Sequence, residues 1–547
     1  MVPDDVEKPP NDAVGLLLAE AGITARRIRE VIALLTESPR TLASLVQASA
    51  VDRRTVESVL DALGDDIIRD DGQLRIAAGA VRDLHDLIEY AELRATTIPD
   101  PLAAAVAKHA DLITTVEGWI TALPRARQAL DHVSATAETA VRRALWLDRT
   151  YDLRGARVLC IGDHDLTSLA LAAVNPHVEI AVVDVDDRIL RYIDEQGTTI
   201  RCLWGDFRFG LPDGVREWGD VVFTDPPYTP DGIRLFLARG VEGLRDRGHG
   251  RLILSYGFGT EHPGLGLKVQ QAIGDLRLVY EAILPSFNRY HGAQAVGSAS
   301  DLYILRPTGH TPAGGASRGK RAPGTNIYTH GAQSLEGSGP PPEIIEAVRA
   351  AAAPDATMIG GNALAGLLAG ERGGTRTPVA LDLSADPGGW LVRALLALDA
   401  PRAAVLVPNS HPDLGDAAAQ AAFTGLFAAK WRLRLRRSTP GPTWAIVEAV
   451  RVDPAKLDAA ASVTRGVLDR AHGKLGNVWR ESLIRAGRDA GHELTKREAA
   501  GLVAAQAGGL VDEQLISLPR HRLDNVPERI TASVVALGTF RGTPGII

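Results

Sequence analysis

The sequence predicts an α/β protein with an N-terminal winged helix, a central doubly wound Rossmann-like domain, and a second, degenerate Rossmann-like α/β domain. Between residues 157 and 305, short apolar runs alternate with helical segments, which is typical of a parallel sheet covered by helices. A similar alternation begins again near residue 378. A stretch rich in Gly, Pro and Ser lies between these regions and is typical of a linker. We expect units at 1–80, 81–150, 151–306, 307–336 and 337–547.

The first unit has the helices and the ribbon of a winged helix-turn-helix. Asp52 is placed to cap the third helix, and an Asp-Asp-Gly turn at 70–72 joins the strands of the ribbon. DNA binding through Arg53 and Arg54 would suit this fold, but residues 26–75 carry eight Arg against nine Asp or Glu. Because DNA-binding domains concentrate positive charge on the surface that contacts the phosphates, we disfavour DNA binding and expect a packing or dimerisation module. The expected elements are helices at 23–35, 41–46 and 52–63 and strands at 66–69 and 73–76.

The remaining elements follow from the same patterns. Residues 81–150 are expected to be a mostly helical connector. The expected central strands are 157–161, 179–183, 220–224, 251–255 and 302–305. In the second half we expect strands at 378–383, 403–407 and 444–450, a helix from Gly389, and mostly helices from about residue 456. Because both halves alternate strands and helices, we hypothesise that they are distant copies of one architecture.

Composition and charge exclude several classes of protein. Two cysteines in 547 residues, Cys160 and Cys202, exclude a disulfide framework and a Cys-rich zinc site, and no metal is expected. Both lie in apolar runs, where we expect packing residues. The net charge of -7 argues against a globally basic nucleic-acid binder. We see neither a secretion signal nor an apolar run long enough to cross a membrane, so we expect a cytoplasmic protein.

The turn after the first central strand carries one glycine and two carboxylates, in Gly162, Asp163, His164 and Asp165. In a doubly wound fold this turn lies at the switch point where ligands bind. Carboxylates beside a helix N-terminus satisfy backbone N–H groups but repel an anionic ligand. The turn therefore favours a cationic ligand, and the alternative is simple capping of the next helix by Asp165.

Two further acids follow later strands. Asp184 comes 22 residues after Gly162, at the end of the second strand, where an acid can bind ribose hydroxyls. The alternative for Asp184 is a helix N-cap. Asp206 follows a short apolar stretch, in a place where an acid commonly meets the adenine amino group, although a Gly-Asp pair is also an ordinary turn. The two acids predict a nucleoside site.

The strongest motif is Asp225-Pro226-Pro227-Tyr228, directly after an apolar strand. The two prolines fix the backbone and remove two N–H donors, which leaves carbonyl groups and the Asp225 carboxylate as acceptors. Tyr228 adds an aromatic face for a cation or a planar group. The motif predicts an acceptor-rich clamp for an amine nucleophile, and the alternative is a Pro-rich turn.

An amine nucleophile also needs a base. An aliphatic amine has a pKa of about 10, so it is protonated at neutral pH and must lose a proton before it attacks carbon. Asp163, Asp165 and Asp225 are the candidate acceptors of that proton. His164, with an ordinary pKa of about 6.5, could also act as the base, and the alternative is a solvent-facing turn residue.

Several of these segments together resemble the branched-chain polyamine synthases, the N4-bis(aminopropyl)spermidine synthase family. The matching segments are 130–144, Gly-Asp-His-Asp-Leu-Thr-Ser at 162–168, Asp-Pro-Pro-Tyr-Thr at 225–229, and Gly-Ser-Ala-Ser-Asp-Leu-Tyr at 297–303. Residues 326–336 are similar to the family's C-terminal tail. The resemblance covers roughly residues 15–336 and leaves 340–547 as an extension.

This resemblance implies a homodimeric, Rossmann-like aminopropyltransferase. Such an enzyme moves an aminopropyl group from decarboxylated S-adenosylmethionine to an internal amine of a polyamine such as spermidine. The family's first turn reads Gly-Asp-Asp-Asp, so His164 keeps the place and not the role of an acid, and His132 stands where the family has Gln. The matching positions imply a catalytic set of Asp163, His164, Asp165, Asp225 and Tyr228, with Gly162, Asp184, Asp206 and Pro226 binding the donor.

Two other functions remain open. Asp-Pro-Pro-Tyr also marks adenine N-methyltransferases, so the first alternative is an amino-group methyltransferase that uses S-adenosylmethionine. The acidic turn speaks against it, because the carboxylate of S-adenosylmethionine would lie near Asp163. The second alternative is a catalytically silent regulator that binds a ligand or DNA. In the second half, residues 381–390 are similar to the first loop of ribose methyltransferases, but later strands lack a catalytic set, so we expect a degenerate structural or regulatory domain.

Overall fold

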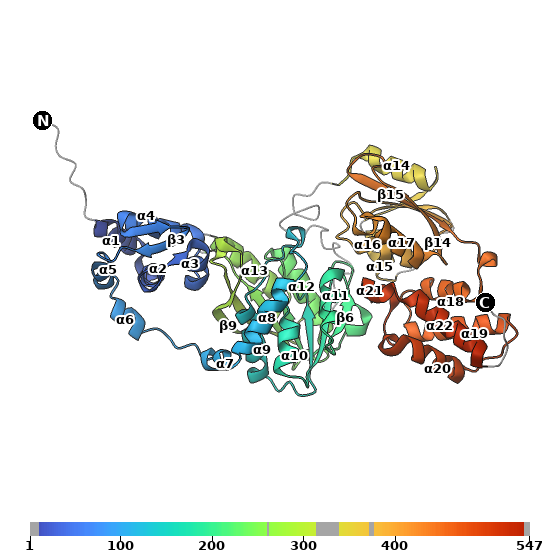
Figure 1. Ribbon diagram of the computed structural model, residues 1–547, viewed down its shortest axis with the longest axis horizontal. Helices are drawn as coiled ribbons and strands as arrows, with labels where there is room; N and C mark the ends of the chain where they lie inside the picture. The colour runs from blue at the N-terminus through green and yellow to red at the C-terminus, as the bar shows by residue number, and fades with distance from the viewer. Residues whose placement is uncertain (1–9, 260–261, 313–338, 361, 371–376, 541–547) are drawn as a thin grey trace.

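The computed structural model describes residues 10–259, 262–312, 339–360, 362–370 and 377–540. These residues form three lobes in a row, coloured from blue through green to red in Figure 1. Most of the expected linker, and all of the segment 326–336, lies outside the described residues. No helix in the described part of the chain is long and apolar enough to span a membrane.

The N-terminal lobe combines helices with a small antiparallel sheet of strand order β1-β3-β2. As expected, the Asp52 side chain caps α4, where it accepts the Thr55 backbone N–H. Helices α5 and α6, expected in the connector, instead pack on the core of this lobe through Leu84 and Leu93. The elements are α1 (Pro10–Ala21), α2 (Ala25–Glu37), β1 (Arg40–Thr41), α3 (Leu42–Ser49), α4 (Arg53–Leu63), β2 (Ile67–Asp70), β3 (Gln73–Ile76), α5 (Val81–Leu87) and α6 (Tyr90–Ala95).

The central lobe is built on a seven-stranded sheet of order β6-β5-β4-β7-β8-β10-β9. The first five strands in this order are parallel, and β10 is antiparallel to both β8 and β9. The order reverses between β4 and β7, which is the switch point of a Rossmann-like sheet. The strands are β4 (Arg157–Ile161), β5 (Glu179–Asp184), β6 (Arg201–Trp204), β7 (Val221–Thr224), β8 (Arg251–Tyr256), β9 (Leu278–Arg289) and β10 (Ala299–Pro307).

Helices cover both faces of this sheet because successive residues of its inner strands point to opposite faces and are apolar on both. Along β4, Val158 and Cys160 belong to one core, and Leu159 and Ile161 belong to the other. The first core contains α7 (Ala103–Lys108), α8 (Ala110–Ala122), α9 (Ala137–Thr150), α10 (Thr167–Val174) and α11 (Asp187–Glu195), and the second contains α12 (Pro230–Gly243) and α13 (Pro263–Asp275). Helices α7 to α9, also expected in the connector, are thus part of the central lobe (Figure 1).

Two strands of the central sheet were not predicted from the sequence. Strand β6 has four residues and begins with an arginine, so its apolar run is too short to be distinctive. Strand β9 lies at the edge of the sheet and contains Pro285, and the next residue, Ser286, has a positive φ of 50°. Proline is tolerated at such an edge, where one side of the strand needs no partner.

The C-terminal lobe repeats part of the central architecture. Its five-stranded sheet has the order β11-β12-β13-β15-β14, with three parallel strands followed by two antiparallel ones. The sub-sheet β4-β7-β8-β10-β9 has the same order and directions, which supports the hypothesis of two related halves. The strands are β11 (Thr357–Ile359), β12 (Val379–Asp382), β13 (Arg402–Pro408), β14 (Trp431–Arg436) and β15 (Trp444–Arg451), of which β11 and β14 were not predicted.

This correspondence corrects the interpretation of the loop 381–390. It follows β12, which holds the place of β7 and not of the first strand. The expected helix near Gly389 is α16, which begins at Trp390. The helices of this lobe are α14 (Pro342–Ala352), α15 (Asn362–Leu368), α16 (Trp390–Ala397), α17 (Ala417–Phe427), α18 (Ala459–Leu468), α19 (Leu475–Asp489), α20 (Lys496–Ala507), α21 (Arg520–Leu523) and α22 (Val526–Phe540).

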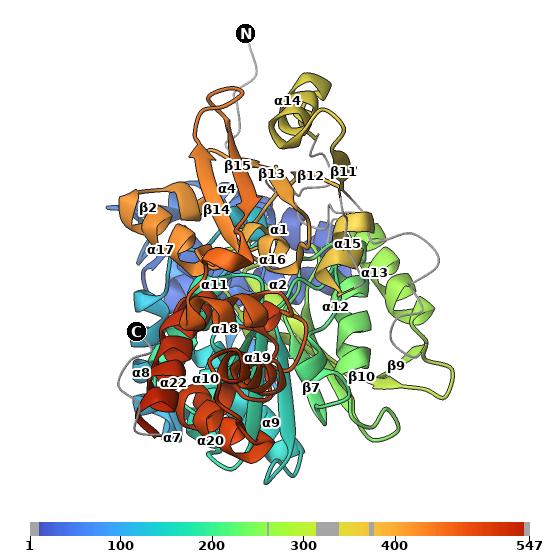
Figure 2. The same ribbon diagram turned by 90° about the vertical axis from the view of Figure 1, so that its right-hand side faces the viewer.

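The C-terminal lobe packs on the β6 edge of the central sheet. Figure 2 shows helices α18, α19, α20 and α22 below the C-terminal sheet. One continuous apolar core runs from the central lobe through Trp204 and Trp390 into these helices. The two lobes therefore share a hydrophobic core and are not connected by the linker alone.

Candidate active site

A cavity of about 400 Å³ opens where the strand order of the central sheet reverses. This is the place where open α/β sheets bind ligands. The structure brings all nine sequence-predicted site residues to its wall: Gly162, Asp163, His164, Asp165, Asp184, Asp206, Asp225, Pro226 and Tyr228.

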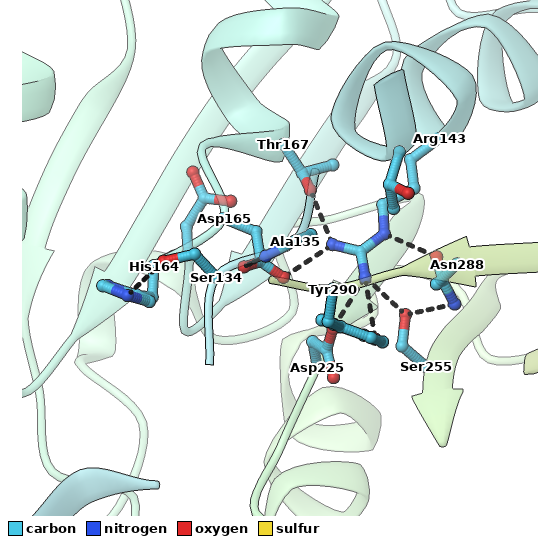
Figure 3. Close-up of polar contacts among 12 residues, drawn as sticks. Ser134, Ala135, Arg143, His164, Asp165, Thr167, Asp225, Ser255, Asn288 and Tyr290 are labelled. Carbon is cyan, nitrogen blue, oxygen red and sulfur yellow. Dashed lines mark hydrogen bonds and ion pairs between the residues drawn. The ribbon is translucent and has the colours of Figure 1, made fainter. Parts of the chain in front are cut away.

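The centre of the site is Arg143, for which sequence reasoning gave no role. Its guanidinium comes from α9, is 1% exposed, and joins the two motif acids by ion pairs of 2.8 Å to Asp165 and 2.6 Å to Asp225 (Figure 3). The buried position of Arg143 could have been found from the helical pattern, because Ala140, Ala144 and Leu147 share its face. The guanidinium also donates hydrogen bonds to Asn288, Thr167, Ser255 and Tyr290.

The two acids on Arg143 differ in their protonation. Burial raises the pKa of Asp165, but the charge of Arg143 and a hydrogen bond from the Ala135 N–H outweigh burial, so the pKa of Asp165 is lowered. For Asp225, burial outweighs the effect of Arg143, and the nearby Asp165 adds to it, so the pKa rises to about 7. Asp165 therefore serves as the permanent counter-ion of Arg143, and Asp225 is the carboxyl that titrates near neutral pH.

Asp163 and Asp184 form a second pair of buried acids. The N-cap residue of α10 is Leu166, and it is Asp163, not Asp165, that accepts a backbone N–H of the first turn, from Ser168 at 3.2 Å. Asp184 accepts the backbone N–H groups of Asp163 at 3.1 Å and Asp186 at 2.8 Å. Burial raises the pKa of each carboxyl to about 7. Among the described residues, neither carboxylate has an Arg or Lys within ion-pair distance.

The Asp225 clamp is completed by tyrosines. Tyr290, the residue directly after β9, donates to Asp225 Oδ2 at 2.7 Å, and Tyr228 donates to Oδ1 at 3.3 Å. Burial raises the pKa of both hydroxyls, so they stay protonated and act as donors. Thr229 ends the turn by capping α12 through the Gly232 N–H. No sequence motif marked Tyr290, which reaches the site only through the fold of β9.

Two histidines lie side by side at the mouth of the acidic turn. The rings of His132 and His164 are stacked, with centroids 4.2 Å apart and an angle of 15° between their planes. The Nε2 atom of His164 lies 3.2 Å from the Ser134 hydroxyl. Burial lowers the pKa of both imidazoles, that of His132 to about 3. Each Nδ1 atom is buried without a hydrogen-bond partner among the described residues.

Asp206 also lines the cavity, and its carboxylate is bound by a cation and an aromatic side chain. Arg208 binds its carboxylate through both a backbone and a side-chain N–H, and Trp390 of the C-terminal lobe donates an indole N–H at 2.9 Å. The guanidinium of Arg208 also lies over the Trp390 ring, 4.8 Å from its centroid. No pattern in the sequence predicted that a residue of the C-terminal lobe contacts a residue of this cavity.

The N-terminal lobe contacts the same site from outside. Gln47 donates to the backbone carbonyl of Tyr290 at 2.6 Å, and Arg53 donates to Gln294 at 3.1 Å. The start of α4, which a winged helix would place in DNA, therefore faces the loop after β9.

Comparison with known proteins matches residues 111–304 to the family of the branched-chain polyamine synthase A C-terminal domain. An uncharacterized protein of Methanocaldococcus jannaschii is 38% identical over 203 residues, which are 36% of this chain and 50% of that protein. The N(4)-bis(aminopropyl)spermidine synthase of the same organism is 29% identical over 33% of this chain and 53% of that enzyme. The chain thus spans about half the length of these curated relatives. A crystal structure of the branched-chain polyamine synthase from Thermus thermophilus, bound to N4-aminopropylspermidine and 5'-methylthioadenosine, aligns over 54% of this chain and 92% of its own, with 20% identity and a TM-score of 0.38.

Proposed function

We propose that the chain transfers an aminopropyl group to a polyamine, because residues 111–304 match the family of the branched-chain polyamine synthase A C-terminal domain. The donor is decarboxylated S-adenosylmethionine, and the acceptor is an internal amine of a polyamine such as spermidine. The relatives named N(4)-bis(aminopropyl)spermidine synthase support this assignment.

The observation that carries the proposal is the excess of carboxylates in the cavity. Arg143 is shared by Asp165 and Asp225, and Asp206 pairs with Arg208. Asp163, Asp184 and Asp225 have pKa values of about 7, so these three carboxyls can gain charge when a cation binds. A bound cation favours the charged form of such acids and lowers their pKa values, so binding is coupled to proton release. Both the sulfonium donor, which lacks a carboxylate, and a polyamine suit this pocket.

Asp225 is the proposed proton acceptor. Its Oδ2 atom is held by Arg143 and Tyr290, whereas Oδ1 makes the longer and weaker contact with Tyr228. The amine nitrogen attacks the aminopropyl carbon next to the sulfonium, the C–S bond breaks, and the electron pair stays on sulfur as a neutral thioether. The proton of the amine passes to Oδ1. A pKa of about 7 suits a base that works at neutral pH.

The stacked histidines shape the acceptor site in place of the family's acid. Both imidazoles are neutral at pH 7 because burial lowers their pKa values. Their buried Nδ1 atoms offer hydrogen-bonding positions for an amine without adding charge. We assign His164 to positioning the amine, and Gly162, Asp184 and Pro226 to the nucleoside of the donor.

The N-terminal lobe is assigned as a winged helix that serves packing. The contacts of Gln47 and Arg53 with the loop after β9 support a structural role. The near balance of Arg and acidic residues in this lobe supports the same view.

The test is an assay of the purified protein with spermidine and either decarboxylated or intact S-adenosylmethionine, read by mass spectrometry of the amine. We expect the mass of one or two aminopropyl groups with the decarboxylated donor only. A methyl group from the intact donor would replace the proposal with the methyltransferase. No product from either donor, together with specific retention of DNA, would favour a regulator.

A further inference from the structure

The second half of the chain carries a relic of the central motif. Strand β12 and helix α16 hold the topological place of β7 and α12. In the sequence, Asp225-Pro226-Pro227-Tyr228 follows β7 directly, and Asp386-Pro387-Gly388-Gly389 follows β12 after three residues.

The relic loop, residues 386–389 of the described part of the chain, has no free backbone N–H groups with which to bind an anion at the start of α16. The buried Asp386 carboxylate accepts four backbone N–H groups, from Gly388, Gly389, Trp390 and Leu391. His411 binds it as well, at 3.1 Å. The N–H groups that would hold an anion at the start of α16 are therefore occupied by a side chain of the loop.

The loop is instead fitted to the central lobe. Arg127 donates to the Pro387 carbonyl, and a Cβ atom on Gly389 would lie 2.6 Å from the Trp204 indole nitrogen. Only glycine allows this approach, which seats the first residue of α16, Trp390, over Arg208 and beside Phe209. Its indole N–H then reaches Asp206 in the wall of the cavity.

This contact completes the hydrogen bonding of Asp206. A carboxylate offers about four lone-pair positions. Oδ1 accepts the backbone N–H of Arg208 at 3.0 Å and its Nε at 2.8 Å. Oδ2 accepts a terminal nitrogen of Arg208 at 2.5 Å and the Trp390 indole at 2.9 Å.

We propose that Trp390 is a positioning residue. Together with Arg208 it occupies the hydrogen-bond acceptor positions of the Asp206 carboxylate, so that Asp206 does not accept a hydrogen bond from the exocyclic amine of the nucleoside. The inference rests on the proposed function, because it deepens the donor specificity of the same site. It replaces the expected role of Asp206, which was to accept the adenine amino group. The base is then recognised by its shape against the wall and not by its amino group.

The first test compares the binding of 5'-methylthioadenosine and 5'-methylthioinosine, which differ at the amino position, by calorimetry. We expect the wild type to bind both within about threefold. Trp390→Phe keeps an aromatic ring and frees one acceptor position on Asp206. We expect this variant to bind 5'-methylthioadenosine about tenfold more tightly than 5'-methylthioinosine, because a hydrogen bond to a charged group contributes about that much affinity. Trp479→Phe is the matched control, because it removes an indole hydrogen bond of 3.1 Å to Ser533 inside the C-terminal lobe. A wild type that prefers the amino form tenfold, or a Trp390→Phe variant with unchanged selectivity, would overturn the inference.

The second test needs no ligand. In the protein labelled with 15N-tryptophan, the indole signal of Trp390 is assigned by its loss in Trp390→Phe. We expect Asp206→Asn to shift this signal and to leave that of Trp479 in place. An unmoved Trp390 signal would overturn the inference. If neither nucleoside binds, the proposed function fails, and the indole signal still decides whether Trp390 holds Asp206.

Discussion

Replacing Asp163 with asparagine should stabilise the ligand-free protein, and the gain should grow with pH. Asparagine keeps an oxygen that accepts the Ser168 N–H but carries no charge. In the wild type, burial raises the pKa of Asp163 from 3.8 to about 7, with Asp165 and Asp184 adding to the effect. Because the folded state binds this proton more tightly than the unfolded state, stability is lost as the pH rises from 3.8 through 7. One pKa unit corresponds to about 1.4 kcal/mol, so the loss is at most about 4 kcal/mol above pH 7.

The measurement is urea unfolding of both proteins, followed by circular dichroism, at about pH 5 and about pH 8.5. At the higher pH the variant should be more stable by up to about 4 kcal/mol, and at the lower pH by less than half of that. Asp275→Asn is the control, because its side chain is 64% exposed and the difference should stay near zero. A gain that is the same at both pH values, or a variant less stable than the wild type at pH 8.5, would refute the reasoning.

Three further substitutions test the charge arrangement of the site. Arg143→Lys cannot reach Asp165 and Asp225 together, so we expect it to lose about 3 kcal/mol or more of unfolding free energy in urea; a wild-type value would show that the shared ion pair is dispensable. Asp225→Asn should lower kcat by about 10²- to 10⁴-fold in the product assay, with a much smaller effect on donor binding, and near-normal turnover would remove Asp225 as the base. His164→Asp restores the family's acid and should raise turnover with spermidine; equal turnover would show that the stacked histidines serve the acceptor as well as an acid does.

The sequence predicted the parts of the site that depend on local pattern. An apolar run followed by a turn marks the end of a strand, and the carboxyl ends of parallel strands lie at one edge of the sheet. The sequence alone therefore predicts that Asp163, Asp184 and Asp225 line one cavity. Arg143 and Tyr290 could not be given roles in this way. Arg143 lies in α9 and Tyr290 directly follows β9, and only the packing of those elements near the switch point brings their side chains to Asp225.

Two features of the fold could not be predicted for the same reason, since they depend on packing and not on local pattern. Residues 81–150 carry helical patterns, but a pattern does not say which core a helix covers, and the helices divide between two lobes. Trp390 follows a loop whose sequence resembles a ligand-binding loop. Its contact with Asp206 depends on how the central and C-terminal lobes dock, which no local pattern shows.

The docking of the C-terminal lobe also limits how the chain can be shortened in experiments. Strand β6 is one of the two edge strands of the central sheet, and its Arg201 is paired with Glu513 of the C-terminal lobe. Next to it, Asp194 is bound by Arg522 and Asp187 by Arg393. A chain shortened before residue 340 would expose a bare sheet edge flanked by unpaired charges, and such edges associate with one another. Loss of activity on shortening would therefore report damage to the central lobe as much as the absence of the C-terminal lobe. Point substitutions at the interface distinguish these two effects better.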